Sequence, residues 1–387
     1  MEEFKTPPIS TLSGSTIKNY FRILKQGHIA PGFYHKIFLT ALIVLIATPF
    51  HIWEEIVFGK KIKELKFKKP PLFIIGHWRS GTTLLHNLLS KDPSAGYITT
   101  YQSLFPNNLA SKWLFKTFMR IKMPPKRPSD RVELNVDFPQ EDEFAFCNSQ
   151  PNSYYNFFLF PSGYKSFYER SINFRDLTQK EIDLWYSTYY KLLGKALINT
   201  KGERLIIKNP INTARIEKVL NLFPDARFIF IYRNPITVFF STQRFFQLVF
   251  PTVWLHKVDN HFIDSMIFDV YNRLMNGYLE QKSLIPPGNL MEIRFEEFER
   301  NPVKGMKKIY TGLLKEDFSA IESYFTNYFK TQKDHKKNKY LVDAAALGAI
   351  RNNWGKFIEM YSYDIPADVE VKMPVENQNE ELHGNIK

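Results

Sequence analysis

The sequence is poor in the residues that cross-link a fold or hold a metal. Cys147 is the single cysteine among 387 residues, which excludes an internal disulfide and suits a reducing compartment. No His/Cys cluster has the spacing of metal ligands and no predicted strand has an acidic Walker-B-like end, so we expect no metal. The start of the chain, Met1–Lys5, is acidic, and no apolar stretch follows it promptly. We therefore expect no signal peptide and a cytoplasmic protein.

The sequence also lacks the signatures of nucleic-acid-binding domains. It contains no helix-turn-helix, zinc-finger or RNA-recognition pattern, so we expect no nucleic acid partner. The formal net charge is nevertheless +13. We assign this charge to a polyanionic ligand and, for the rest, to an acidic substrate or anionic lipid. No internal repeat occurs, and the sequence does not indicate an oligomeric state.

Apolar residues are plentiful: 44% of the chain is hydrophobic, enough for a large core. From Pro70 onward, strand-like runs alternate with helix-like stretches, which is typical of a mostly parallel sheet. We expect an α/β fold with a P-loop-NTPase-like central sheet and helices on both faces. A helical, partly apolar segment (residues 1–66) precedes this single domain (67–360), and a polar tail (361–387) follows it. The expected strands are Leu72–Gly76, Leu205–Lys208, Arg227–Arg233 and Leu290–Phe295.

A glycine-flanked loop between a strand and a helix is the most informative segment. The apolar run Phe73–Ile75 leads into Gly76, and the loop passes through Gly81 into an amphipathic helix. Such a loop directs backbone N–H groups and a helix dipole at one point, which makes an anion site. An NTPase P-loop has lysine where this chain has Thr82, and the charge comes from Arg79 instead. We therefore expect a phosphate other than the triphosphate of ATP or GTP, although a turn without ligand has the same pattern. The expected anion-binding residues are Gly76, His77, Arg79, Ser80, Gly81, Thr82 and Thr83.

A second strand also ends in a positive charge. Arg227–Arg233 closes with arginine, and Pro235 starts a helical stretch that contains Ser241. An arginine at the carboxyl end of a parallel strand points into the ligand crevice. Ser241, about two helical turns further on, can reach the same group. The alternative is a surface arginine and a helix-capping serine.

Together these segments resemble the motifs of the sulfotransferases that use 3′-phosphoadenosine-5′-phosphosulfate (PAPS). The resemblance rests on Arg79-Ser80-Gly81-Thr82-Thr83 and on the pair Arg233 and Ser241, and it runs from about Pro70 to about Phe357. Lys208-Asn209-Pro210 is similar to the strand-Lys-x-Pro element of the bacterial branch. The resemblance implies that the glycine-flanked loop holds the 5′-phosphosulfate and that Arg233 and Ser241 hold the 3′-phosphate. It also implies PAPS as the donor and an alcohol as the acceptor.

Sulfuryl transfer, like phosphoryl transfer, depends on positioning and fixed positive charge more than on covalent chemistry. Arg79 is expected to hold the 5′-phosphate. Lys208, at the end of its strand, is expected to stabilise the charge that develops on the bridging oxygen. The alternative for Lys208 is an ordinary lysine at a strand end.

The acceptor alcohol needs a general base. The segment Pro139–Phe144 resembles the Pro-x-Glu-Asp/Glu-x-aromatic element of the bacterial branch, and its first candidate base is Glu141, its second Glu143. Three consecutive carboxylates on a solvated turn are the alternative. His77, inside the loop, is a further candidate for contact with donor or acceptor. Some relatives carry a histidine where this chain has Asn212, which weakens the case for an assisting histidine here.

Two hydrophobic stretches of the sequence bear on the nature of the acceptor and on membrane contact. An aromatic-rich stretch (154–168) and the apolar run Ile37–Phe50 favour a lipophilic alcohol, a sterol or lipid, although the aromatic residues could equally form core. The run has 14 residues, short of the ~20 that span a bilayer. It fits a helix packed on the domain, a helix lying in the membrane surface, or a span. Residues 37–69 include six lysines suited to anionic headgroups, so peripheral membrane contact is expected through them.

Two other functions fit parts of the sequence. An NTP-dependent kinase would use a P-loop, but Thr82 stands in the place of its lysine. A catalytically silent, membrane-peripheral scaffold would keep the P-loop-like core without a ligand. The complete set of candidate residues favours the enzyme.

Overall fold

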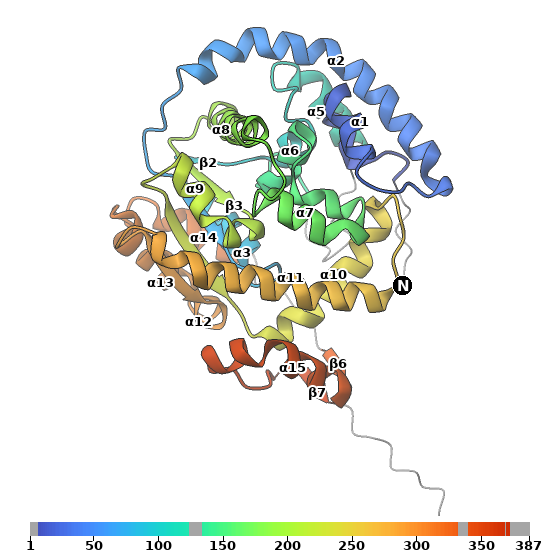
Figure 1. Cartoon of the computed structure of the whole chain (residues 1–387). Coiled ribbons are helices and arrows are strands. Elements are labelled where there is room, and N and C mark those ends of the chain that lie inside the picture. The colour runs from blue at the N-terminus through green and yellow to red at the C-terminus, as the bar shows by residue number, and fades with distance from the viewer. Residues whose placement is uncertain (1–6, 124–133, 332–339, 368, 372–387) are drawn as a thin grey trace, which may run out of the picture.

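All five strands of the central sheet run parallel. The computed structural model describes residues 7–123, 134–331, 340–367 and 369–371 (Figure 1), and within them the sheet has the order β2-β3-β1-β4-β5. The four strands expected from apolar runs are confirmed. β2 is absent from the prediction because two residues carry no periodic pattern. The strands are β1 (Leu72–Ile75), β2 (Ala95–Gly96), β3 (Arg204–Lys208), β4 (Arg227–Tyr232) and β5 (Leu290–Arg294).

The register of the sheet brings three strand ends to one edge. Ile74 in β1 pairs with Lys208 in β3 and with Ile229 in β4. Because the strands are parallel, the loop after β1, the end of β3 and the turn after β4 share the carboxyl edge, where open α/β sheets bind ligands. The candidate residues of both motifs therefore meet on one side of the molecule.

Helices cover both faces of the sheet, as the sequence predicts. On one face Phe73 and Ile75 pack against α8, α10, α11 and α15; on the other Leu72 and Ile74 pack against α3, α12, α13 and α14. The alternation follows from the two-residue period of a strand. The helices are α1 (Ile17–Leu24), α2 (Tyr34–Lys63), α3 (Thr82–Leu89), α4 (Thr100–Leu104), α5 (Lys112–Lys122), α6 (Asp142–Ser149), α7 (Tyr164–Ser171), α8 (Gln179–Thr200), α9 (Ile216–Leu222), α10 (Pro235–Val253), α11 (Asn260–Gln281), α12 (Phe295–Arg300), α13 (Pro302–Lys308), α14 (Glu322–Thr331) and α15 (Ala344–Met360).

The aromatic-rich stretch is core. It forms a 3₁₀ turn, Tyr154–Phe158, followed by α7, and its rings pack on one another and on Phe246 and Phe250 of α10. The aromatic side chains of residues 154–160 are all buried. These residues therefore give no support to a lipophilic acceptor.

The N-terminal apolar run is part of a longer helix than the sequence predicts. α2 continues through Pro49 to Lys63, although a proline inside a helix removes one backbone hydrogen bond. Residues Pro31–Lys63 are long and apolar enough to cross a membrane, by length and composition alone. Figure 1 shows α2 along one side of the molecule. The prediction that this segment is too short to span a bilayer is thus wrong. Whether the helix packs on the domain, lies in a membrane surface or spans it must be judged from its contacts.

The expected polar tail begins as part of the domain. Tyr361 stacks on Tyr232 with ring centroids 4.4 Å apart, and β7 (Val369–Val371) pairs with β6 (Tyr340–Val342). Residues 372–387 lie outside the described residues.

Candidate active site

Two glycines shape the loop between β1 and α3. Gly76 has a φ of +131°, and a Cβ there would lie 2.2 Å from the carbonyl oxygen of Ile231. Gly81 has a φ of +94°, and its Cβ would lie 2.1 Å from the ring of Phe295. Any other residue at either position would clash and adopt a strained backbone. The loop can therefore approach β4 and α12 closely and lead directly into α3.

Arg79 joins the two motifs. Its φ is +66°, in the left-handed region that is unfavourable for a residue with a side chain. Its Nε donates to Ser241 Oγ at 2.9 Å, and its carbonyl oxygen accepts from Arg233 Nη1 at 3.3 Å. Backbone strain of this kind gathers at ligand sites. Residues from the ends of β1 and β4 and from α10 thus form one cluster, in which the Arg79 guanidinium contacts the Ser241 hydroxyl and the Arg233 guanidinium contacts the Arg79 backbone.

The turn that carries Arg233 is held from the neighbouring strand. Asn234 caps α10 through its side chain, which accepts from the N–H of Ile236 at 3.0 Å. The N–H of Asn234 donates to Glu296 Oε1 at 3.0 Å, and the guanidinium of Arg233 lies 4.5 Å from the centroid of Phe295. A cation over an aromatic face is attracted to it and oriented by it. α12, which directly follows β5, therefore orients Arg233.

Glu141 and Lys208 form a buried ion pair. Lys208 Nζ donates to Glu141 Oε1, and the Tyr155 hydroxyl donates to Glu141 Oε2. Tyr155 in turn accepts a hydrogen bond of 3.3 Å from Trp78 Nε1, which belongs to the loop after β1. Glu141 is 8% exposed and Lys208 3%. One carboxylate oxygen therefore contacts the lysine at the end of β3, and the other is linked through Tyr155 to the loop after β1.

Glu143 has a different environment. It is fully buried and paired with Arg215, while Ser153 Oγ at 2.9 Å and the N–H of Tyr154 at 3.0 Å donate to its Oε1. Asn209 Nδ2 donates to Oε2 at 2.9 Å. Both oxygens are occupied by neighbours that hold the core together. The alternative of a solvated acidic turn is wrong, because residues 141–143 are all buried.

Comparison with known proteins identifies the family. The model of the sulfotransferase family matches residues 70–319. The chain belongs to the sulfotransferase family.

Sulfotransferases are also its relatives among characterised proteins and solved structures. The omega-hydroxy-beta-dihydromenaquinone-9 sulfotransferase Stf3, from Mycobacterium bovis and from Mycobacterium tuberculosis, is 29% identical over 332 residues, which cover 86% of this chain and 85% of that protein. The sulfotransferase STF9 of Mycobacterium avium has a TM-score of 0.64 at 15% identity, over 95% of this chain and 100% of that one. STF1 of Mycobacterium tuberculosis has a TM-score of 0.63 at 16% identity, over 80% and 86%. The two structures confirm the fold.

A buried polar network supports the acidic segment of this sulfotransferase. Asp142 Oδ2 accepts from the Tyr189 hydroxyl at 2.6 Å and from Asn209 Nδ2 at 3.3 Å. Its Oδ1 is buried without a partner among the described residues. Burial, and after it the negative charge of Glu143, raises the pKa of Asp142 to about 7. The first turn of α6 is thus tied to α8 and to the segment after β3.

His77 contributes to the sulfotransferase core rather than to an exposed surface. Its ring is buried, lies against Tyr271 with centroids 5.0 Å apart, and contacts the carbonyl oxygen of Trp78 through Nδ1 at 2.9 Å. Burial lowers the pKa of His77 to about 4, so the ring is neutral at physiological pH. The N–H of Gly76 is likewise engaged, by Thr213 Oγ1 at 2.8 Å. In this state neither group is available to an anion.

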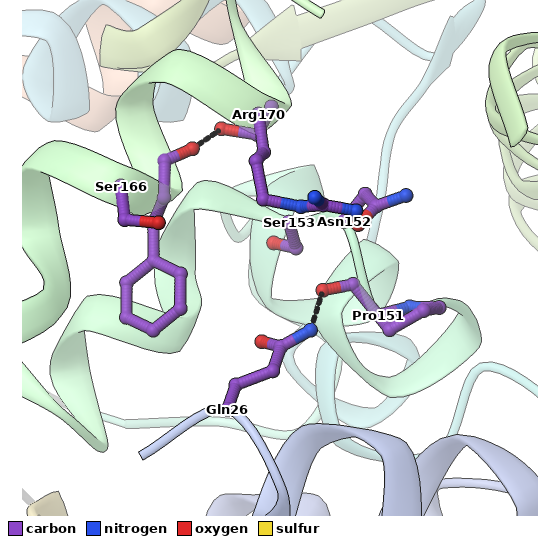
Figure 2. Close-up of a pocket in the computed structure, with 8 residues that line it drawn as sticks. Gln26, Pro151, Asn152, Ser153, Ser166 and Arg170 are labelled. Atoms are coloured by element: carbon purple, nitrogen blue, oxygen red, sulfur yellow. Dashed lines mark hydrogen bonds between the residues drawn. The ribbon is translucent and has the colours of Figure 1, made fainter. Parts of the chain in front are cut away.

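No group of three or more His, Cys, Asp and Glu side chains is placed to hold a metal ion within the described residues. Figure 2 shows a pocket of about 300 Å³ between the end of α1, the loop before Tyr154 and α7. It is lined by Gln26, Pro151 and Arg170 among others, and by none of the predicted site residues. Gln26 Nε2 donates across it to the carbonyl oxygen of Pro151 at 3.0 Å. We assign it no role in the reaction.

Sequence reasoning missed the residues that hold the site together. Trp78 and Tyr155 connect the loop to Glu141, and Asn209 and Arg215 hold Glu143. Trp78 lies within the predicted loop and Asn209 within the predicted Lys-x-Pro element, so position alone could have drawn attention to both. Tyr155 is one aromatic residue in an aromatic stretch, and Arg215 belongs to no motif.

Proposed function

We propose that this sulfotransferase transfers a sulfuryl group from PAPS to the hydroxyl of a lipophilic alcohol. The observation that carries the donor assignment is the cluster of Arg79, Arg233 and Ser241, formed from two motifs that lie 154 residues apart. Two guanidinium groups and a helix N-terminus beside one another favour a ligand with more than one phosphate. A donor with a 3′-phosphate and a 5′-phosphosulfate has that character.

The cluster divides between the two ends of the donor. Arg79, the hydroxyls of Thr82 and Thr83 and the backbone of Ser80 and Gly81 bind the 5′-phosphosulfate in this proposal. Arg233 and Ser241 bind the 3′-phosphate. The incoming donor replaces the Arg79–Ser241 hydrogen bond with two charge-assisted bonds, one from Arg79 to the 5′-phosphosulfate and one from Ser241 to the 3′-phosphate, and such bonds are the stronger kind.

Glu141 is the proposed base. It accepts the proton of the acceptor hydroxyl as the acceptor oxygen bonds to sulfur, and the bond between sulfur and the 5′-phosphate oxygen breaks. Lys208 stabilises the negative charge that the leaving phosphate gains. The buried contacts support this division: Glu141 shares its oxygens with Lys208 and Tyr155. Glu143 is held by Arg215, so we assign it to structure.

The acceptor assignment rests on the relative rather than on the aromatic residues. Stf3 is named for an omega-hydroxy menaquinone, a lipid with a terminal hydroxyl. At 29% identity over 86% of this chain, that supports a lipophilic alcohol as the acceptor here. A cytoplasmic location with contact to the membrane surface fits this acceptor and stays a prediction.

Nucleotide binding tests the donor assignment. We expect the desulfated product, adenosine 3′,5′-bisphosphate, to bind tightly by calorimetry, and Arg233→Ala to weaken it about 10- to 100-fold, because a charge-assisted hydrogen bond is lost. Arg22→Ala, an exposed arginine on α1, is the matched control and should bind like the wild type. ADP–Mg²⁺ binding of equal strength would favour a kinase. Absence of binding by both nucleotides would favour the scaffold. Either result overturns the proposal.

A further inference from the structure

The outward face of α2 is apolar along its length. Its exposed side chains have exposed fractions between 39% and 75%: Phe38, Leu39, Leu42, Leu45, Ile46, Ile52, Trp53 and Ile56. A helix on the surface of a soluble protein normally turns polar residues to water. Contiguous apolar surface of this extent marks a site of contact with a partner or a membrane.

Two charged residues of α2 face the protein, while Glu55 is exposed and pairs with Lys191. Lys36 Nζ donates to the carbonyl oxygen of Thr252 at 2.9 Å, and Glu54 pairs with Lys195 and accepts from the N–H of Ala110 at 3.2 Å. Both Lys36 and Glu54 are buried. Apolar side chains of the helix therefore face outward, and these two charged side chains face the protein. This is the reverse of a helix exposed to water, and it is the arrangement that a lipid environment favours.

These inward contacts also fix the orientation of α2. Lys36 lies in its first turn and Glu54 18 positions later, so the anchored length is about 27 Å at 1.5 Å per residue. That is nearly the ~30 Å thickness of the hydrocarbon core. A helix that crossed the bilayer would have to break both buried contacts, whereas a helix lying in one leaflet keeps them.

A second helix that packs on α2 also exposes apolar side chains. Phe115 of α5 contacts Phe50 of α2 edge to face, with ring centroids 5.3 Å apart, and both belong to one small core. The other side of α5 exposes Trp113 (65%) and Ile121 (74%). Tryptophan is the side chain that most favours the boundary between headgroups and acyl chains.

The charge at the end of α2 identifies the kind of membrane. Five lysines follow the apolar face and are exposed: Lys60, Lys61, Lys63, Lys66 and Lys68. The acidic residue of this stretch, Glu64, lies 3.9 Å from Lys60. Lysines at this position are attracted to an anionic membrane surface.

We propose that α2 and α5 form a membrane-docking surface that lies in one leaflet of a bilayer with anionic headgroups. The apolar faces enter the acyl region and the lysines after α2 contact the headgroups. This inference is independent of the nature of the donor. It adds to the proposed function the place from which a lipid alcohol would be taken.

Vesicle binding tests the docking surface in the full-length protein. We expect co-sedimentation with vesicles of phosphatidylcholine and phosphatidylglycerol (7:3), and at least tenfold weaker binding to pure phosphatidylcholine. Ile46→Gln/Ile52→Gln should weaken binding to the anionic vesicles by at least tenfold. Leu184→Gln/Leu284→Gln changes two aliphatic residues that are 46% and 51% exposed outside α2 and α5, and it should leave binding unchanged.

Two further measurements separate the remaining interpretations. Brominated lipids should quench the fluorescence of the exposed tryptophans of the docking surface, Trp53 and Trp113, most strongly when the bromine is at a shallow acyl position; strongest quenching at the bilayer centre would overturn the in-plane orientation. Light scattering without lipid tests the alternative that a second copy of the chain covers this apolar surface. The proposal would be overturned if the wild type does not bind vesicles but forms a dimer that Ile46→Gln/Ile52→Gln converts to a monomer. Binding of adenosine 3′,5′-bisphosphate is measured on every variant, so failure of docking and failure of the donor assignment are distinguished.

Discussion

Two neighbouring glutamates in the acidic segment have opposite surroundings. Glu141 contacts a lysine and a tyrosine hydroxyl at the edge of the sheet where donor and acceptor are proposed to meet. Glu143, two residues further, is held by a fully buried arginine and three further donors. A general base must reach the acceptor hydroxyl. Glu141 keeps 8% exposure, whereas Glu143 is fully buried.

Substitution of each glutamate distinguishes the two roles. Glu141→Gln should lower kcat by about 10²- to 10⁴-fold, because the amide cannot accept the proton. Binding of adenosine 3′,5′-bisphosphate should stay close to that of the wild type. Steady-state sulfation of a long-chain primary alcohol and calorimetry measure the two quantities. An unchanged kcat would exclude Glu141 as the base.

Glu143→Gln is the matched comparison. It leaves Arg215 buried without its counter-charge, which typically costs about 3–5 kcal/mol of stability. We expect a lower Tm as its main effect, measured by thermal unfolding. A normal Tm together with a loss of kcat as large as that of Glu141→Gln would exchange the two assignments.

At the scale of elements, a polar network joins α6 to the segment after β3. Tyr189 of α8 donates to Asp142 and accepts from Asn212 Nδ2 at 3.1 Å, while Asn209 donates to both Asp142 and Glu143. Glu141 immediately precedes α6, and Lys208 ends β3. The network therefore sets the distance between the proposed base and the proposed stabilising cation.

Asp142 makes the stability of this junction depend on pH. Its pKa is raised from an ordinary 3.8 to about 7, so the folded protein keeps a proton that the unfolded chain has released. Stability should then fall as pH rises between about 4 and 7, by at most about 1.4 kcal/mol per pH unit. Asp142→Asn removes the titrating proton and should flatten this dependence. Denaturant unfolding at pH 5, 6, 7 and 8 measures it, with Asp183→Asn, on α8, as the control outside the network. Parallel pH profiles for wild type and Asp142→Asn would refute the assignment.

The sequence allows the strands, the glycine-flanked loop after β1 and the two arginines at the carboxyl edge of the sheet to be predicted because each has a local pattern. An apolar run that ends in glycine or arginine is visible within ten residues. The partners of the acidic segment are different: Arg215 reaches Glu143 across 72 positions and Lys208 reaches Glu141 across 67. No local pattern encodes such pairs, because they depend on which elements the fold places side by side. The hydrophobicity of α2 can likewise be predicted from the sequence. That Lys36 and Glu54 face the protein rather than the solvent cannot.

At the scale of the molecule, α8 connects the proposed docking surface to the active site. Lys195 and Lys191 of α8 pair with Glu54 and Glu55 of α2. Tyr189, on the same helix, bonds Asp142 next to the proposed base. A helix is a rigid rod over such a short distance. The orientation of the protein on a bilayer would therefore fix the direction in which the active site meets an acceptor.

This arrangement predicts that the docking surface matters for acceptors in a membrane and not for acceptors in solution. Ile46→Gln/Ile52→Gln should lower the rate of sulfation of a long-chain primary alcohol in anionic vesicles by at least tenfold, because the enzyme no longer concentrates at the bilayer. Its rate on a short, water-soluble primary alcohol should equal that of the wild type. Leu184→Gln/Leu284→Gln should be normal on both. Equal losses on the two acceptors would show damage to the fold. If the variant has lost vesicle binding but sulfates both alcohols at the rate of the wild type, the enzyme reaches the long-chain alcohol without docking. That result would mean that the acceptor is not taken from the bilayer.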